Sequence, residues 1–136
     1  MNDNIETLRR GYESFSRGDM SATLELFADD IEWNEPEWTY GTPTGTFRGK
    51  QEVLRLWEQI PETNDSFSLE PREFLGEGDT VVVTGVFRVS PKGSGRTAEV
   101  PFAHVWRLSD GKAVSHHGYV DVREIYALSR ELKRAA

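Results

Sequence analysis

The sequence predicts an α+β fold in which N-terminal helices cover one face of a curved antiparallel sheet. Two observations predict it. Helical patterns dominate the first half of the chain, in the order helix, helix, strand, helix, and several strand-like runs follow before one closing helix. The length of 136 residues fits a single domain, residues 1–136, which can bury a core without metal or disulfide staples.

Two helices are expected at the N-terminus. Asp3 and Glu6 have capping-box spacing, and apolar residues follow at helical intervals until Gly18 supplies a C-cap. Asp19 can cap the second helix, whose apolar stripe extends to Ala28. A helical pair followed by a strand is therefore the predicted start of the fold.

A short strand over 31–35 comes next. Ile31, Trp33 and Glu35 share a face in an extended chain, and Pro36 keeps Glu35 out of the helical region. The later elements are expected, in order, as a loop or lid at 36–48, a helix at about 50–60 ended by Pro61, strands at 67–69, 72–75 and 80–89, a hairpin within 97–122 and a helix at 123–134.

The hairpin is the most informative element. Asp110-Gly111 between alternating apolar residues is a strong signal for a two-residue turn, in which paired residue numbers sum to 221. His104 would then lie opposite His117, and directly paired residues share a face. We interpret the inward face as a pocket wall, because it is too polar to be only a core: it would hold Phe102, His104, Trp106, His117, Tyr119 and Asp121.

Composition excludes several classes of function. The net charge of −7 disfavours nucleic-acid and anionic-membrane partners, and the absence of cysteine excludes disulfides and thiolate chemistry. The polar start is unlike a signal peptide, and no run reaches membrane-spanning length. We therefore expect a cytoplasmic protein whose partners are small molecules.

Three stretches carry a family resemblance: GYESFSRGDMSATLELFADDIEWNEP, GTFRGKQEVLRLW and HVWRLSDGKAVSHHGYVD. They resemble the SnoaL-like and ketosteroid-isomerase-like group of the nuclear transport factor 2 superfamily, and the resemblance covers nearly the whole chain. It implies a cone with a deep pocket, commonly a homodimer through the outer face of the sheet. This fold hosts enzymes, binding modules and scaffolds alike.

The resemblance implies two candidate catalytic carboxylates. Glu35 matches the general base of ketosteroid isomerases, and a carboxylate that faces an apolar chamber should have a raised pKa. The alternative is that Glu35 turns to solvent. Asp121 matches the general acid/base of SnoaL-like polyketide cyclases, and the alternative is that it caps the helix that begins near Arg123.

The oxyanion donors of ketosteroid isomerases are a tyrosine and a protonated aspartate. The matching positions here hold Gly11 and Ala103, so strict steroid isomerase activity is not expected. Tyr12, His104 and Tyr119 are the candidates to supply these donors instead.

The histidine pair has two readings. His104 and His117 are either satisfied core residues or acid/base groups, and at least one should be neutral, because two like charges would lie side by side. A metal with Glu35 as third ligand is weakly supported, since no ligand motif of known spacing is present, and we predict none. Asp121 lies four residues beyond His117, about 13 Å, so we expect no hydrogen-bonded Asp121–His104 dyad.

The leading hypothesis is an enzyme that carries out cofactor-independent acid/base proton transfer, of isomerase or cyclase type, on an apolar carbonyl-bearing compound. Glu35 or Asp121 would be the base. The alternative is a non-catalytic ligand-binding or scaffold module of the same fold. The expected pocket walls are Tyr12, Trp33, Trp38, Tyr40, Trp57, Phe102, Trp106 and Tyr119.

Overall fold

The structure is a computed structural model that describes residues 3–36 and 44–135. Its helices are α1 (Asp3–Ser16), α2 (Met20–Glu25), α3 (Lys50–Glu58), α4 (Ile60–Thr63) and α5 (Arg123–Ala135). Its strands are β1 (Phe27–Glu35), β2 (Gly45–Arg48), β3 (Asn64–Glu77), β4 (Thr80–Pro91), β5 (Ala98–Ser109) and β6 (Lys112–Val120).

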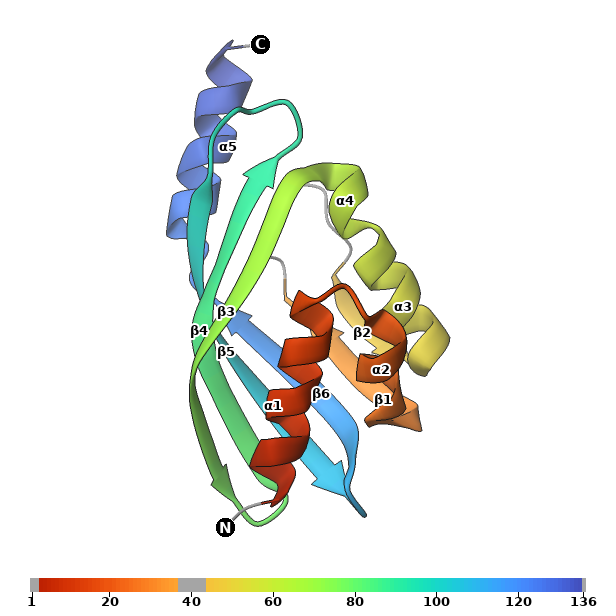
Figure 1. Cartoon of the computed structure of the whole chain (residues 1–136). Coiled ribbons are helices and arrows are strands. Elements are labelled where there is room, and N and C mark those ends of the chain that lie inside the picture. The colour runs from red at the N-terminus through yellow and green to blue at the C-terminus, as the bar shows by residue number, and fades with distance from the viewer. Residues whose placement is uncertain (1–2, 37–43, 136) are drawn as a thin grey trace.

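The strands form one curved sheet in the order β2-β1-β6-β5-β4-β3, and α1 lies against its concave side (Figure 1). The α+β fold with N-terminal helices on a bent sheet is therefore confirmed. Among the described strands, β1 and β6 pair in parallel, whereas the other neighbouring pairs are antiparallel. These two strands come from opposite ends of the chain, so no hairpin sets their relative direction.

The two N-terminal helices form at the positions that their capping residues predicted. Asp19 accepts a hydrogen bond from the Ala22 amide (3.1 Å), and Gly18 adopts a positive φ of 79° after α1. The second helix is shorter than expected, because Phe27 already belongs to β1 and pairs with Ala113 of β6. Sheet pairing overrides the helical pattern there.

The middle of the chain differs from the prediction in three places. Pro61 lies in the first turn of α4, a position that tolerates proline, instead of ending a single helix. The strands expected at 67–69 and 72–75 form one strand, β3, with a register shift between Pro71 and Glu73. Within the expected loop or lid at 36–48, residues 45–48 form β2, and residues 37–43 lie outside the described residues.

The bend of β3 depends on a glycine of β4. Gly85 pairs with Pro71, and a Cβ built on Gly85 would lie only 2.1 Å from the Glu70 carbonyl oxygen and 2.9 Å from Phe102 Cζ. An extra residue in one strand bends it, and the missing side chain on the facing strand permits the close approach. This bend curves the sheet around its concave side.

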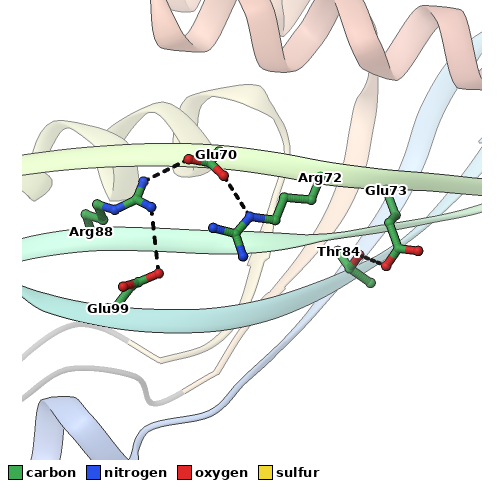
Figure 2. A network of polar contacts seen from close by, with 6 residues as sticks. All are labelled: Glu70, Arg72, Glu73, Thr84, Arg88 and Glu99. Carbon is green, nitrogen blue, oxygen red and sulfur yellow. Dashed lines mark hydrogen bonds and ion pairs between the residues drawn. The ribbon is translucent and has the colours of Figure 1, made fainter.

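Figure 2 shows the outward face of the same bend. Arg72 and Arg88 both donate hydrogen bonds to the Glu70 carboxylate, at 2.7 and 3.0 Å, and Arg88 also lies 3.7 Å from Glu99 on β5. The two arginines hold the pKa of Glu70 below its usual value. These exposed ion pairs link three strands but contribute little stability individually.

The turn of the hairpin is confirmed, but the register beyond it is not. Asp110 and Gly111 have positive φ values of 51° and 77°, and Leu108 pairs with Ala113 as the sum of 221 requires. A register shift between Arg107 and Leu108 then moves every later pair by one residue. His104 pairs with Gly118, so the prediction that it lies opposite His117 was wrong.

The shift exchanges the two faces of β6. His116 is turned inward and is only 1% exposed, whereas His117 is exposed and Tyr119 is 55% exposed. An aromatic environment accounts for the difference: the His116 ring stacks on Trp33 and contacts Trp106, while His117 and Tyr119 stack on each other at the surface. No helix within the described ranges is long and apolar enough to cross a membrane.

Candidate functional site

A cavity of about 80 Å³ lies between the concave side of the sheet and the helices α1 and α3. Its walls are mainly aromatic and aliphatic, and Glu35 is the one charged side chain among the described lining residues. Of the expected wall residues, the cavity is lined by Tyr12, Trp33, Trp57 and Trp106. Trp38 and Tyr40 lie outside the described residues.

A second, larger chamber adjoins this cavity. This outer chamber, about 410 Å³, lies between the end of α1, α4 and the start of β3, and it shares Phe15, Trp57 and Phe67 with the inner cavity. The inner volume alone holds several water molecules. The two volumes therefore adjoin at these aromatic rings.

Three polar side chains converge at one end of the inner cavity. The Tyr12 hydroxyl lies 2.6 Å from His104 Nδ1 and accepts a hydrogen bond from Trp106 Nε1 (3.0 Å). Tyr12 and His104 are 6% and 7% exposed, so this cluster is shielded from bulk water. Hydrogen bonds are stronger in such an environment, and charged forms are costly.

Burial determines the protonation states of this cluster. It lowers the pKa of His104 from 6.5 to about 3, and it raises the pKa of Tyr12 well above 10 against the opposing effect of the Trp106 hydrogen bond. Both side chains are therefore neutral at pH 7. A neutral phenol beside a neutral imidazole can offer a hydrogen bond without carrying a charge.

Glu35 reaches the cavity from the end of β1. It is half-buried, and its Oε1 accepts a hydrogen bond from Trp33 Nε1 at 3.0 Å. The side chain lines the same cavity as Tyr12 and His104. The alternative was that Glu35 turns out to solvent at the strand end. The side chain lines the cavity instead.

Glu35 and His104 flank a glycine. Gly118 of β6 pairs with His104 on one side; on the other, Asn34 pairs with His117, so Glu35 lies level with Gly118. Neighbouring strands are about 4.8 Å apart, which places the backbones of Glu35 and His104 about 10 Å apart. The space over Gly118 is occupied by the Pro36 ring, whose Cδ would be 3.2 Å from a Cβ on Gly118. Gly118 thus lies between a carboxylate and the Tyr12–His104 pair.

His116 lies beside Gly118. Its ring stacks on Trp33 with centroids 3.7 Å apart, its centroid lies 4.7 Å from that of His104, and its Cε1 would be 3.4 Å from a Cβ on Gly118. Neither ring nitrogen has a hydrogen-bond partner among the described residues. An unpaired buried polar group costs about 1–3 kcal/mol, so this side chain calls for a functional explanation.

The remaining predicted site residues lie elsewhere. His117 and Tyr119 are on the outer face of β6, because of the register shift. Phe102 is buried and stacks on His104 at 4.1 Å without lining the cavity. Asp121 binds Arg123 in an ion pair of 2.6 Å at the surface, which lowers the pKa of the carboxyl group.

Asp121 therefore does not act as the second carboxylate of this cavity. Its Oδ1 accepts a hydrogen bond from the Arg123 amide at the start of α5, which is the capping role considered as the alternative. His104 bonds with Tyr12, so the two side chains have different partners, in agreement with the expectation that they form no dyad.

Sequence reasoning missed His116 and Gly118. Both follow from the register shift in β6, and the neighbouring His117 offered an equally polar alternative. No group of three or more potential metal ligands occurs within residues 3–36 and 44–135. The site is thus built from one carboxylate, two histidines and a tyrosine in an aromatic shell.

The buried histidines make stability depend on pH. The unfolded chain binds protons near pH 6.5, whereas burial lowers the pKa of His104 to about 3 and that of His116 well below 6.5. The stability that these neutral histidines contribute is therefore fully present above pH 6.5 and falls as the pH drops, for His104 by about 2–3 kcal/mol at pH 4.5. Urea unfolding at pH 7 and 4.5 should show a smaller loss in His104→Gln than in the wild type. His117→Gln should keep the wild-type loss, and equal losses in all three proteins would contradict this assignment.

The fold and the site together define a class. A curved sheet that closes with its N-terminal helices around an aromatic cavity, with a few convergent polar groups, is the architecture of a cone-shaped small-ligand domain. The family described as SnoaL-like domain matches residues 8–116. The chain therefore belongs to the SnoaL-like family, within the nuclear transport factor 2-like (NTF2-like) superfamily.

Solved structures agree with this assignment. An NTF2-like protein of unknown function from Burkholderia pseudomallei is 35% identical, with a TM-score of 0.84 over 94% of this chain and 98% of that one. TerC, co-crystallised with polyporic acid, is 32% identical, with a TM-score of 0.84 over 95% and 99%. IdmH from Streptomyces antibioticus, named as a candidate polyketide cyclase, is 24% identical, with a TM-score of 0.78 over 95% and 99%, and shows the fold alone. A comparison with curated proteins gives no match.

Proposed function

We propose that the protein is a cofactor-independent acid/base enzyme that moves a proton next to the carbonyl group of a flat, apolar small molecule. One observation carries this proposal: Glu35 and the Tyr12–His104 pair line the same aromatic cavity and lie on either side of Gly118. A general base and a hydrogen-bond donor in one cavity are the two groups such a reaction needs.

The proposed step balances without a cofactor. A Glu35 oxygen takes a proton from the carbon next to the carbonyl, so a C–H bond breaks and an O–H bond forms. The electron pair of the C–H bond moves onto the carbonyl oxygen as an enolate, which the Tyr12 hydroxyl stabilises by donating a hydrogen bond. Return of the proton from Glu35 to the same or another carbon completes an exchange or an isomerisation.

The tautomer of His104 decides whether Tyr12 can act as this donor. A phenol has one proton and accepts up to two hydrogen bonds. If Nδ1 of His104 carries its proton, both His104 and Trp106 donate to the Tyr12 oxygen, and the Tyr12 proton is directed to the ligand. Because burial lowers the pKa of His104, the His104 ring stays neutral and does not protonate the enolate outright.

The aromatic shell and the family support the same class of ligand. A flat ring can stack on walls made of Trp33, Trp57 and Trp106. A neutral ligand suits this cavity, because the one charged side chain among its described lining residues is the Glu35 carboxylate. TerC, which is 32% identical, was co-crystallised with polyporic acid, a small organic molecule. The ligand proposed here is likewise small and organic.

A specific observation favours the alternative of a non-catalytic ligand-binding module. Tyr12, His104 and Trp106 already satisfy one another, and the inner cavity is only about 80 Å³. A module that kept the pocket and bound a ligand without turning it over would also have this geometry. The two functions differ in whether a bound ketone exchanges its protons.

The test uses β-tetralone, a flat bicyclic ketone, in deuterated buffer, with NMR to follow loss of the protons next to its carbonyl. We expect the wild-type protein to accelerate this exchange and Tyr12→Phe to lower the rate by about 10²–10³-fold, as when an oxyanion donor is removed. Tyr119→Phe, on the exposed outer face, is the matched control and should leave the rate unchanged. Binding of the ketone with no exchange above buffer would establish the module instead.

A further inference from the structure

His116 is the one described buried side chain whose polar atoms have no partner among the described residues. It is 1% exposed, on the concave side of β6, two residues from Gly118. Stacking on Trp33 alone would be served as well by a phenyl ring, which leaves no polar atom unpaired. The imidazole nitrogens therefore indicate a role beyond packing.

Trp33 links His116 to the candidate base. Its indole ring stacks on the His116 ring, at 3.7 Å and 15°, and its Nε1 donates to Glu35 Oε1 at 3.0 Å. The Glu35 carboxyl group thus lies at the edge of a stack of two nearly parallel rings. Trp33 pairs with His116, and Glu35 is the next residue of β1 on the same face, so Glu35 and His116 are diagonal neighbours.

The two rings offer complementary hydrogen-bonding groups. An indole N–H is a donor only, and it suits an unprotonated carboxyl oxygen. Once Glu35 has taken a proton, its new O–H is a donor, and the Trp33 N–H is not an acceptor for it. A neutral imidazole always has one unprotonated nitrogen, and burial keeps His116 neutral because it lowers its pKa.

We propose that His116 is a positioning residue for Glu35, whose unprotonated ring nitrogen accepts a hydrogen bond from the protonated Glu35 carboxyl group during the proton transfer. The proton itself stays on Glu35, so no further group is charged and none is oxidised or reduced. Trp33 holds the other carboxyl oxygen in both states. This inference rests on the proposed function, because it assigns a partner to the same base.

The first readout needs no substrate. A hydrogen bond accepted from the neutral acid favours that form, so its loss lets Glu35 ionise more readily. In His116→Phe, the midpoint of the Glu35 carboxyl titration, followed by carbon-13 NMR, should move to lower pH by about one unit. His117→Phe, one residue along and on the outer face, should leave the midpoint in place. A packing role for His116 would change unfolding without moving this midpoint.

The second readout is exchange of β-tetralone. His116→Phe should lower the exchange rate at least about 10-fold, and His116→Gln, which restores an acceptor oxygen, should recover part of it. His116→Leu replaces the phenylalanine variant if circular dichroism shows that the larger ring prevents folding. Wild-type exchange and an unmoved midpoint in the apolar variant would overturn the role of His116 while leaving Glu35 as the base. Exchange that survives Glu35→Gln would instead overturn the proposed function, and a moved midpoint would still support the His116–Glu35 contact.

Discussion

Gly85→Ala should strongly lower the free energy of unfolding of the protein. A Cβ at this position would lie 2.1 Å from the Glu70 carbonyl oxygen and 2.9 Å from Pro71 Cα, and both are backbone atoms of the facing strand. Flexible side chains can yield to such contacts, but a paired backbone yields only by breaking the β3–β4 ladder. We expect a loss of at least about 3 kcal/mol, a large part of the roughly 5–15 kcal/mol by which folded proteins are stable.

The matched control is another glycine-to-alanine change. Gly11 lies inside α1 with an ordinary φ, and a Cβ there would be 3.3 Å from a methyl group of Leu26, which can rotate away. Gly11→Ala should therefore be neutral or gain up to about 1 kcal/mol from helix propensity. Urea unfolding of both variants measures the difference. Equal stability of the two variants would show that β3 does not need the close approach at Gly85.

The consequence of this bend reaches the candidate site. Phe102, whose Cζ faces Gly85, stacks on His104 at 4.1 Å. A shift of β3 would therefore disturb the side chain that holds Tyr12. Partial folding of Gly85→Ala should accordingly be accompanied by loss of exchange activity.

Glu35→Gln should have the largest effect on the proposed reaction. The amide cannot take a proton from carbon, and removal of a general base lowers rates by about 10²–10⁴-fold. Its carbonyl oxygen can still accept the hydrogen bond from Trp33 Nε1, so folding should be retained. Initial rates of β-tetralone exchange, with unfolding curves of the same samples, separate these two effects.

The control for this variant comes from the same strand. Glu32 forms an exposed ion pair with Arg48 at 2.8 Å, and such pairs contribute little. Glu32→Gln should therefore keep both stability and exchange. If Glu35→Gln exchanged the ketone at the wild-type rate, Glu35 would not be the base, and Asp121 would not replace it, because Asp121 binds Arg123 away from the cavity.

Local chemistry in the sequence predicted the parts of the fold that depend on neighbouring residues. Asp19 caps its helix and Asp110-Gly111 makes the hairpin turn, because each acts on residues within a few positions. The ends of α2 and β1 depend instead on pairing between Phe27 and Ala113, which are distant in sequence. No periodicity in one segment could reveal that pairing.

The register of β6 shows most clearly where the sequence was insufficient. Its odd-numbered positions include His117 and Tyr119, and its even-numbered positions include His116 and Gly118, so neither set is distinctly apolar. A one-residue bulge then exchanged the faces. Burial of His116 beside Trp33 and Trp106 favours the observed register, and those contacts form only in the folded sheet.

The sequence predicted only part of the candidate site, and the register of β6 is again the reason. Tyr12, Glu35 and His104 lie on elements whose faces the apolar pattern determines, and all three line the cavity. Asp121 and His117 depended on the register of β6, and neither lines it. The family resemblance alone could not distinguish these two groups of residues.

A crystal structure of the protein with β-tetralone bound would show whether Glu35 and Tyr12 reach the same ligand. We expect the ketone in the inner cavity, with its oxygen within about 3 Å of the Tyr12 hydroxyl and the neighbouring carbon within about 3.5 Å of a Glu35 oxygen. The ring plane should lie against Trp33 or Trp106. A ketone held only in the outer chamber, or one whose carbonyl points away from Tyr12, would contradict the roles proposed for Glu35 and Tyr12.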